Sequence, residues 1–445
     1  MKFVRSRYLM LSKNTYADAN GRRARLAYAA RKATLFALDE ATAAALEGGE
    51  IPELQLDRLR QLTAVVPEGE DELASVLAHL RSGSDDRSIR GFTIIPTNYC
   101  NMACDYCGQE HYKSAVDNAR LGRLAARVEA TIADPATRSV NVTWFGGEPL
   151  LALRVIRELS ARFAAAAQEH GKDYAAHMAT NGSLLTVPTL RLLHHECKLQ
   201  TVEVTIDGPE EVHNRRRLKR NGTGSYQHIV WVLGEAIREQ VAPELRISIR
   251  TNVDAENEGT VGELITDLAA RGLAVPQIEL NPVPVHSWGN DVSAVELAGR
   301  HYAELEVGWL RQAQSLGFGF GVIPTALKRT TCRATSVSGE IVDSQERIYS
   351  CSEHPLVPGV RETGVVARVS DLAGSQTRPR GMFDDWYDDI DDGTQGCGRC
   401  ALLPVCGGAC PKLWREGHVP CPSMKFNWDE RVDILAERLG YKAQL

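Results

Sequence analysis

The sequence has neither the long apolar segments of a membrane protein nor the strong charge of a nucleic-acid-binding protein. Its 445 residues contain no uninterrupted apolar run near the roughly 20 residues of a membrane-spanning helix, and no signal-type apolar run follows the first residues. The formal net charge is −6, which gives no reason to expect broad nucleic-acid binding. We therefore expect a cytoplasmic protein without a membrane or nucleic-acid partner.

Cysteine is absent from the first 99 residues, although the chain has 11 cysteines in all. They crowd into two places, one beginning at Cys100 and the other in the last third of the chain. In a cytosolic chain such clustering points to metal or redox chemistry rather than to a disulfide framework. Only Cys197 stands alone, on a segment with a helical pattern, and we expect an ordinary buried thiol there.

The composition, 43% hydrophobic and 24% charged, is that of a soluble protein with two or three domains. Residues 1–85 predict a small α/β domain that ends in a Ser/Gly-rich linker at 82–86. Asp39 is placed to cap a helix that stops at Gly48. The expected order is strand 8–11, turn 20–21, an alternating stretch over 24–38, helix 40–47, a helix around 56–62, strand 64–66 and helix 73–80. This order suits a winged-helix-like domain.

Strands and helices alternate from residue 91 to about 320. The strands are expected at 92–96, 140–145, 175–180, 201–206, 246–251 and 277–282. A helical pattern follows each strand, which predicts an α/β fold with a parallel sheet, closed into a partial (β/α)6 TIM-like barrel. Chemistry on such folds collects at the carboxyl ends of the strands, and Cys100 lies just beyond the first one.

The segment 325–445 breaks into short turns rich in proline, glycine and cysteine. Such a segment buries little apolar surface, so we expect metal to hold its shape. An acidic run over 384–392 is expected to be a solvated helix or loop before the last cysteine group.

Three thiols, Cys100, Cys104 and Cys107, lie within eight positions. A closed zinc site or a four-iron cluster has four positions to fill, so one stays open. This CxxxCxxC pattern, with Tyr106 before the last cysteine, resembles the radical S-adenosylmethionine superfamily. The resemblance implies a 4Fe-4S cluster whose open iron chelates the cosubstrate.

Polar residues follow several predicted strands and suit the same ligand. Gly146, Gly147 and Glu148 form a GGEP segment, which the resemblance assigns to the amino group of S-adenosylmethionine. Asn181 ends the third strand, and Arg250 and Asn252 end the fifth, where they are candidates for contacts to the methionine carboxylate and the ribose. We expect this rim to form the cosubstrate pocket.

The segment 206–217 resembles an IDGP…HD…R motif of peptide-modifying members, with Asn214 where an aspartate is usual. Arg217 is then expected to face substrate or cosubstrate. The neighbouring cations Arg215, Arg216, Lys219 and Arg220 are expected on a solvated loop, with an acidic leader peptide as the alternative partner. His111 follows the first cysteine group and is expected to be a surface histidine.

The cysteines of the last third resemble the SPASM extension, which carries two auxiliary 4Fe-4S clusters. By position, one cluster takes Cys397, Cys400, Cys406 and Cys421, and the other takes Cys332, Cys351 and Cys410 and lacks a fourth ligand. The alternative is that both clusters merely staple the domain. Glu346 stands where the family often has glycine, so the turn there is expected to differ.

The resemblance implies a radical SAM/SPASM peptide maturase, an oxidoreductase with three 4Fe-4S clusters. A 5'-deoxyadenosyl radical then modifies a ribosomally synthesised precursor peptide, with a C–C or thioether crosslink as the expected product. The front domain is similar to leader-recognition domains, with an unspecialised cap as the alternative, and the electron donor is a flavodoxin or ferredoxin. Two other functions stay open: sulfatase-maturase-like oxidation of a Ser or Cys side chain, and a non-catalytic metal-binding protein. No proton-handling residue is identified.

Overall fold

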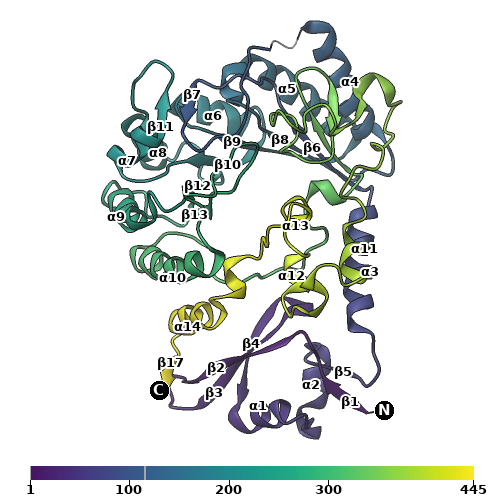
Figure 1. The fold of residues 1–445 in the computed structure, drawn as a ribbon, viewed down its shortest axis with the longest axis vertical. Coiled ribbons are helices and arrows are strands. Elements are labelled where there is room, and N and C mark those ends of the chain that lie inside the picture. The colour runs from purple at the N-terminus through teal and green to yellow at the C-terminus, as the bar shows by residue number, and fades with distance from the viewer. Residues whose placement is uncertain (1, 115–116, 445) are drawn as a thin grey trace.

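A nine-stranded sheet forms the centre of the computed structural model, which describes residues 2–114 and 117–444 (Figure 1). Its strand order is β13-β12-β10-β9-β8-β6-β14-β15-β16. The first six of these strands are parallel. They are β6 (Ile89–Ile94), β8 (Ser139–Trp144), β9 (Asp173–Thr180), β10 (Leu199–Thr205), β12 (Arg246–Val253) and β13 (Ile278–Pro284). The predicted parallel α/β sheet is confirmed, and its closure into a partial barrel stays a prediction.

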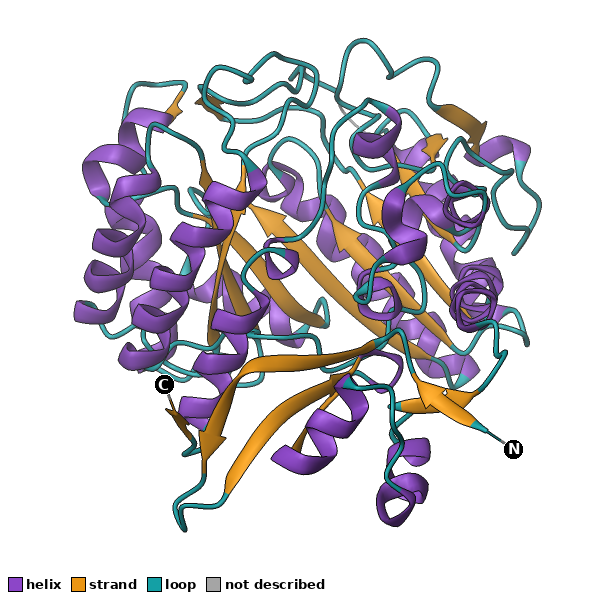
Figure 2. Cartoon of the chain, turned by 60° about the horizontal axis from the view of Figure 1, so that its bottom comes forward, coloured by secondary structure: helices purple, strands orange, loops and turns teal. Residues whose placement is uncertain are grey.

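Helices follow the parallel strands and cover one face of the sheet (Figure 2). They are α4 (Asn118–Ala133), α5 (Leu153–His170), α6 (Val187–His195), α7 (Glu210–Arg216), α8 (Tyr226–Arg238), α9 (Val261–Ala270) and α10 (Gly299–Leu316). Alternation along each strand sends Val140, Val142 and Trp144 into the core under these helices, fully buried. The residues between them point to the other side, here called the inner face, which carries Asn141, Thr143, His177, Ala179, Glu203 and Arg250.

The N-terminal region follows the predicted element order with two differences. It comprises β1 (Phe3–Arg5), β2 (Leu9–Ala17), β3 (Arg23–Ala29), β4 (Thr34–Asp39), α1 (Glu40–Glu47), α2 (Leu56–Gln61), β5 (Val65–Pro67) and α3 (Glu72–Asp85). The short strand β1 precedes the first predicted strand, and the stretch 24–38 forms two strands, β3 and β4. Asp39 caps α1 as expected, accepting from the Thr42 backbone N–H at 2.8 Å. Its winged-helix character and its boundary at residue 85 stay predictions.

The predicted linker at 82–86 is wrong, because α3 continues to Asp85. A Cβ on Gly83 would lie 1.8 Å from the Arg329 carbonyl oxygen. Ser84 is buried and donates to the Thr330 hydroxyl at 3.0 Å. The small residues therefore let the helix pack against a distant segment, where composition alone suggests flexibility.

The C-terminal region joins both other parts of the molecule. Its strand β14 (Gly339–Val342) pairs in parallel with β6, and β17 (Lys442–Gln444) adds to the edge of β2. Tyr28 and Trp428 pack with their ring centroids 4.9 Å apart. The remaining elements are β15 (Arg347–Tyr349), β16 (Val365–Arg368), α11 (Trp386–Asp391), α12 (Leu403–Cys406), α13 (Pro411–Arg415) and α14 (Trp428–Arg438). Two of these helices have only four and five residues, in keeping with the expected short turns. The expectation that this segment buries little apolar surface is wrong, because Leu403, Trp428 and Val432 are buried in a core shared with the N-terminal region.

The acidic run over 384–392 is only partly solvated, which corrects the prediction. Trp386, Tyr387 and Ile390 are buried between its aspartates, and Asp384 pairs with the buried Arg378 at 2.7 Å. The apolar residues of α11 pack against α3. The number of aspartates in this segment gave no sign of that packing. Among the described residues, no helix combines the length and apolarity that a bilayer crossing requires.

Candidate active site

The loop after β6 carries the first cysteine group and is tied to the loop after β10. Its short strand β7 (Met102–Cys104) pairs antiparallel with β11 (Arg217–Lys219), which puts Cys104 opposite Arg217. Cys100, Cys104 and Cys107 all line one cavity of about 350 Å³ at the carboxyl ends of the parallel strands. The backbone pairing therefore fixes where the three thiols lie.

Burial raises the pKa of each of these thiols. The pKa of Cys104 rises to about 12, mainly by burial, while the nearby Arg217 guanidinium acts to lower it. Burial likewise raises the pKa of Cys100 and Cys107. Thiols in such a place ionise only beside positive charge, so three of them around one cavity fit a metal centre.

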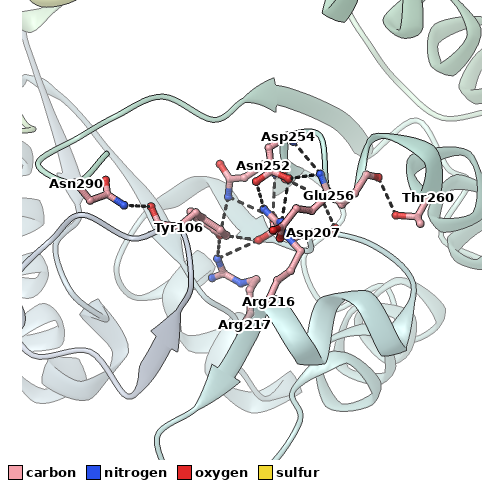
Figure 3. Close-up of polar contacts among 10 residues, drawn as sticks. Tyr106, Asp207, Arg216, Arg217, Asn252, Asp254, Glu256, Thr260 and Asn290 are labelled. Atoms are coloured by element: carbon pink, nitrogen blue, oxygen red, sulfur yellow. Dashed lines mark hydrogen bonds and ion pairs between the residues drawn. The ribbon is translucent and has the colours of Figure 1, made fainter. Parts of the chain in front are cut away.

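Tyr106, just before the last cysteine, is the hub of a polar network (Figure 3). Its hydroxyl donates to Asp207 at 2.6 Å and accepts from Asn252 at 3.0 Å and from Arg217. Asp207 also accepts from the Asn252 backbone N–H at 2.9 Å and lies 3.5 Å from Arg217. Residues at the carboxyl ends of β10 and β12 thus hold the cysteine loop at its centre.

The expected solvated loop of cations is wrong for one member. Arg216 is 1% exposed and pairs with Asp254 at 2.6 Å (Figure 3). Arg215 and Arg220 are exposed as predicted, and Lys219 is half-buried. Arg220 also lines the cavity and donates to the Cys100 carbonyl at 3.0 Å.

Asn214 has a structural role at the position where the resembling family has an acid. Its Oδ1 accepts from the backbone N–H groups of Ser225 and Tyr226 at 2.9 and 3.1 Å, at the start of α8. It therefore acts as a cap for that helix, satisfying N–H groups that have no partner within it.

The two glycines after β8 leave room for the cysteine loop to pack closely against the end of that strand. A Cβ on Gly147 would lie 2.3 Å from the Tyr99 carbonyl oxygen, and one on Gly146 would lie 2.6 Å from Ile95 Cγ2. Gly146 also has a φ of 125°, which disfavours any side chain. Both glycines line the cavity, with their backbone open to a ligand.

Glu148 lies behind this wall rather than on it. The side chain is fully buried, and its carboxylate accepts from the Leu150 N–H at 3.0 Å, the Thr180 hydroxyl at 2.8 Å and the Asn181 N–H at 2.8 Å. Burial raises its pKa, while these hydrogen bonds act in the opposite direction. Glu148 therefore joins the ends of β8 and β9, and its contact to an amine stays a prediction.

The other predicted cosubstrate residues line the cavity together. Asn181 donates to Asn101 at 2.9 Å and lies 3.7 Å from the Cys100 sulfur. Arg250 donates from Nε to Asn252 at 2.9 Å and lies 3.7 Å from Glu203. These contacts hold amide and guanidinium groups at the rim and leave donors facing the cavity.

Four further residues of the cavity wall were missed or misjudged. His111 is half-buried, with Nε2 3.7 Å from the Cys107 sulfur and Nδ1 3.2 Å from the Asn98 carbonyl, so the surface prediction is wrong. Glu203, Trp288 and Glu353 also line the cavity. Alternation along β10 points Glu203 to the inner face, so the sequence pattern could have predicted that it lines the cavity. The other two come from loops whose course the sequence does not reveal.

The later cysteines gather as two groups. Cys397, Cys400, Cys406 and Cys421 line one cavity of about 50 Å³. Burial raises the pKa of Cys351, and the nearby Cys332 and Cys410 raise it further. In the described part of the chain, no three His, Cys, Asp or Glu side chains converge as one metal ion requires. A four-iron cluster takes its thiolates at separate irons, so the thiol groups fit that cofactor better.

The structure bears on two smaller predictions about single residues. Cys197 is 1% exposed, which confirms the buried thiol. Glu346 adopts a φ of 64°, a left-handed backbone conformation that glycine favours, and a departure of the turn from the family's stays a prediction. Arg123 lies 2.7 Å from its carboxylate.

Comparison with known proteins agrees with this geometry. The model for the Radical SAM superfamily matches residues 94–268, from the end of β6 into α9. An uncharacterized protein of Synechocystis is 30% identical over 139 residues, a match that spans 30% of this chain and only 34% of that protein. A serine-type anaerobic sulfatase-maturating enzyme of Klebsiella pneumoniae is 26% identical over 341 residues, covering 70% of this chain and 79% of the enzyme.

Solved structures resemble the chain in fold. The structure of anSMEcpe with bound AdoMet and Kp18Cys peptide has a TM-score of 0.59 and 15% identity, covering 79% of this chain and 98% of that one. At this identity the likeness concerns the fold alone, and it includes the parallel sheet that positions the candidate site.

Proposed function

We propose that this chain is a radical SAM enzyme that modifies a ribosomally made precursor peptide, because the Radical SAM superfamily model matches residues 94–268. One observation carries the proposal. Three thiols, an open glycine backbone and the polar side chains of Asn181, Arg250 and Asn252 face a single cavity. This is the set of groups that a cluster with one open iron and an amino-acid cosubstrate would need.

The residues of the site have separate tasks in this proposal. Cys100, Cys104 and Cys107 would hold a 4Fe-4S cluster, and the wall formed by Gly146 and Asn181 would hold S-adenosylmethionine. Together these two groups supply a carbon radical able to remove hydrogen from an unactivated carbon. Arg217 places positive charge beside the thiolates, and Tyr106 keeps the loop in register with the cosubstrate wall.

The rest of the chain would serve the peptide and the electrons. Cys397, Cys400, Cys406 and Cys421 would hold one auxiliary cluster, and the group at Cys351 would hold another, giving three clusters. We propose that residues 1–85 bind a leader segment, that a flavodoxin or ferredoxin reduces the enzyme, and that the reaction takes place in the cytoplasm. The product would be a C–C or thioether crosslink.

A second candidate function is oxidation of a Ser or Cys side chain in a sulfatase. It is favoured by the 26% identity to a serine-type sulfatase-maturating enzyme over 70% of the chain. The two functions differ in product, because oxidation of Ser or Cys leaves an aldehyde that hydrazines trap, whereas a crosslink leaves none. Tandem mass spectrometry of treated peptides with and without a hydrazine separates them.

The radical chemistry is tested on protein prepared without oxygen. We expect about twelve iron atoms per chain and, after reduction, cleavage of S-adenosylmethionine to methionine and 5'-deoxyadenosine. The triple variant of Cys100, Cys104 and Cys107 to Ala should lose this cleavage and about four of the irons. Cys197→Ala is the matched control and should lose neither. Cleavage that survives the triple substitution would overturn the proposal.

A further inference from the structure

A second cavity, of about 340 Å³, opens at the amino-terminal side of the central sheet. Gly91 of β6, Asn141 of β8 and His177 of β9 line it from the inner face, and Arg333 enters from the C-terminal region. His177 lies two positions before Ala179, which lines the active-site cavity, so these two lining residues are about 7 Å apart along β9. Both cavities are therefore lined by the inner face of the same sheet, and the second one lies nearer the amino ends of its strands.

Arg333 is the unusual residue of this cavity. Its Nη2 donates to the Thr143 hydroxyl at 2.9 Å, while its Nη1 is buried and has no hydrogen-bond partner among the described residues. No carboxylate of the described chain lies within ion-pair distance of its guanidinium. The buried arginines of the described chain are all paired, as in Arg216 with Asp254 at 2.6 Å and Arg378 with Asp384 at 2.7 Å, whereas the half-buried Arg333 has no ion pair among the described residues.

The surrounding backbone makes space for this cation. A Cβ on Gly91 would lie 3.3 Å from the Arg333 Cζ, and one on Gly339 would lie 2.9 Å from the Arg333 Cβ. The acidic residue of the wall, Asp86, is engaged by Arg329 at 2.5 Å. A guanidinium held in such a place without a counter-charge is costly, which points to an anionic partner supplied from outside the chain.

Two neighbouring side chains leave polar groups free for the same partner. Neither Asn141 nor His177 makes a side-chain hydrogen bond to another described residue, although both face the cavity. A carboxylate can accept from the Arg333 guanidinium and from the Asn141 amide at once, and guanidinium N–H groups match its geometry.

We propose that this second cavity binds a carboxylate, held by Arg333 with Asn141 and His177. Resting on the proposed function, this carboxylate belongs to the peptide substrate, either from an acidic side chain or from the chain terminus. The cavity would then fix how deeply the peptide enters beneath the active site, and so which residue is modified.

The test measures ligand-induced shifts of the unfolding temperature, using anaerobically prepared enzyme at constant ionic strength. Three probes differ only in their carboxylate: acetyl-alanine with a terminal one, acetyl-aspartic acid amide with a side-chain one, and acetyl-alanine amide with none. We expect at least one of the acids, and not the neutral amide, to raise the unfolding temperature, because a ligand of the native state stabilises it. Equal shifts from all three probes would overturn the proposal.

Single substitutions test which residues are responsible for the shift of the unfolding temperature. Arg333→Met should abolish the shift, Arg333→Lys should retain part of it, and Arg329→Met, which removes a paired cation from the same wall, should leave it intact. Without a probe, Arg333→Met should unfold no earlier than the wild type, whereas Arg378→Met should unfold earlier. Asn141→Leu tests a second residue of the cavity wall, on β8, and should weaken the shift. A full shift in both Arg333→Met and Asn141→Leu contradicts the assignment.

The binding test stands apart from the test of the proposed function. Cleavage of S-adenosylmethionine without peptide should be unchanged in Arg333→Met, because Arg333 does not line the active-site cavity. If cleavage fails in the wild type while the acids still bind, the proposed function is wrong and the carboxylate site stands. If cleavage occurs and no acid binds, only the carboxylate site is wrong.

Discussion

The first and last cysteine groups are held by different means. Cys104 lies in a strand paired to β11, and Tyr106 is hydrogen-bonded to Asp207 just after β10 and to Asn252 at the end of β12. In the segment 397–421, regular structure is limited to the end of a 3-10 helix at Gly396–Arg399, the four-residue α12 and the five-residue α13. Three consecutive residues between them, Gly407, Gly408 and Ala409, have φ values of 72°, 94° and 62°.

This difference indicates which site the protein preorganises. Because the contacts of the first group run to the central sheet, we expect scaffold residues to place it with or without the proposed cluster. In the last group, the indole N–H groups of Trp386 and Trp414 donate to the Gly407 and Gly408 carbonyls at 3.0 and 2.8 Å. Regular backbone pairing is otherwise sparse there, so we expect its geometry to depend on the cluster.

Removal of iron should have the largest effect, and it should affect the last cysteine group far more than the central sheet. Amide exchange in 397–421 should accelerate by about 100-fold or more, whereas β8 and β9 should change by less than about 3-fold. Hydrogen exchange with mass spectrometry, on chelator-treated and intact protein, measures both segments in one sample. Equal acceleration in both would show that the last group is no more metal-dependent than the sheet.

Gly147→Ala should damage the first group without affecting the last. The new methyl would lie 2.3 Å from the Tyr99 carbonyl oxygen, so either the cysteine loop or the glycine turn must move. We expect S-adenosylmethionine affinity to fall by about 100-fold, measured by equilibrium dialysis, with the iron of the last group retained.

Gly122→Ala is the matched control for that substitution. Gly122 lies in α4, and a Cβ there meets nothing within 4 Å. Affinity should be unchanged, and stability should rise by about 1 kcal/mol, since alanine favours a helix. A similar loss of affinity in both variants would refute the close-approach argument.

Tyr106→Phe tests how much one hydroxyl contributes to holding the first cysteine group in place. The substitution removes the donor to Asp207 and the acceptor of Asn252 and Arg217, and leaves these polar groups without a partner. We expect a loss of about 1–3 kcal/mol in unfolding free energy and about tenfold weaker S-adenosylmethionine binding. Tyr99→Phe is the control, because the Tyr99 hydroxyl bonds no described residue. Calorimetry and dialysis should show no comparable change in it.

Local pattern was sufficient to predict the sheet and most of the site. Six short strand patterns, each followed by a helical pattern, predicted the parallel strands, and the parallel arrangement brings the strand ends to one rim. Asn181, Arg250 and Asn252 therefore meet at the cavity although about 70 residues of chain separate the first from the last.

What failed depends on contacts between distant segments. Arg216 was expected in solvent because its partner Asp254 lies 38 positions away. Gly83 suggested a linker, while its actual role is to admit the Arg329 backbone. Neither of these pairings has a sequence period or spacing that would reveal it.

Glu346→Gly should have the smallest effect and tests whether the left-handed turn before Cys351 needs its side chain. Glycine relieves the strain of a φ of 64°, but it loses the exposed pair with Arg123 at 2.7 Å and adds freedom to the unfolded chain. These terms oppose one another, so unfolding free energy should change by less than about 1 kcal/mol in either direction. Denaturant unfolding measures it, with Arg123→Ala as the control that removes the pair alone. A loss well above that range in Glu346→Gly, absent from Arg123→Ala, would mean that the glutamate fixes the turn by itself.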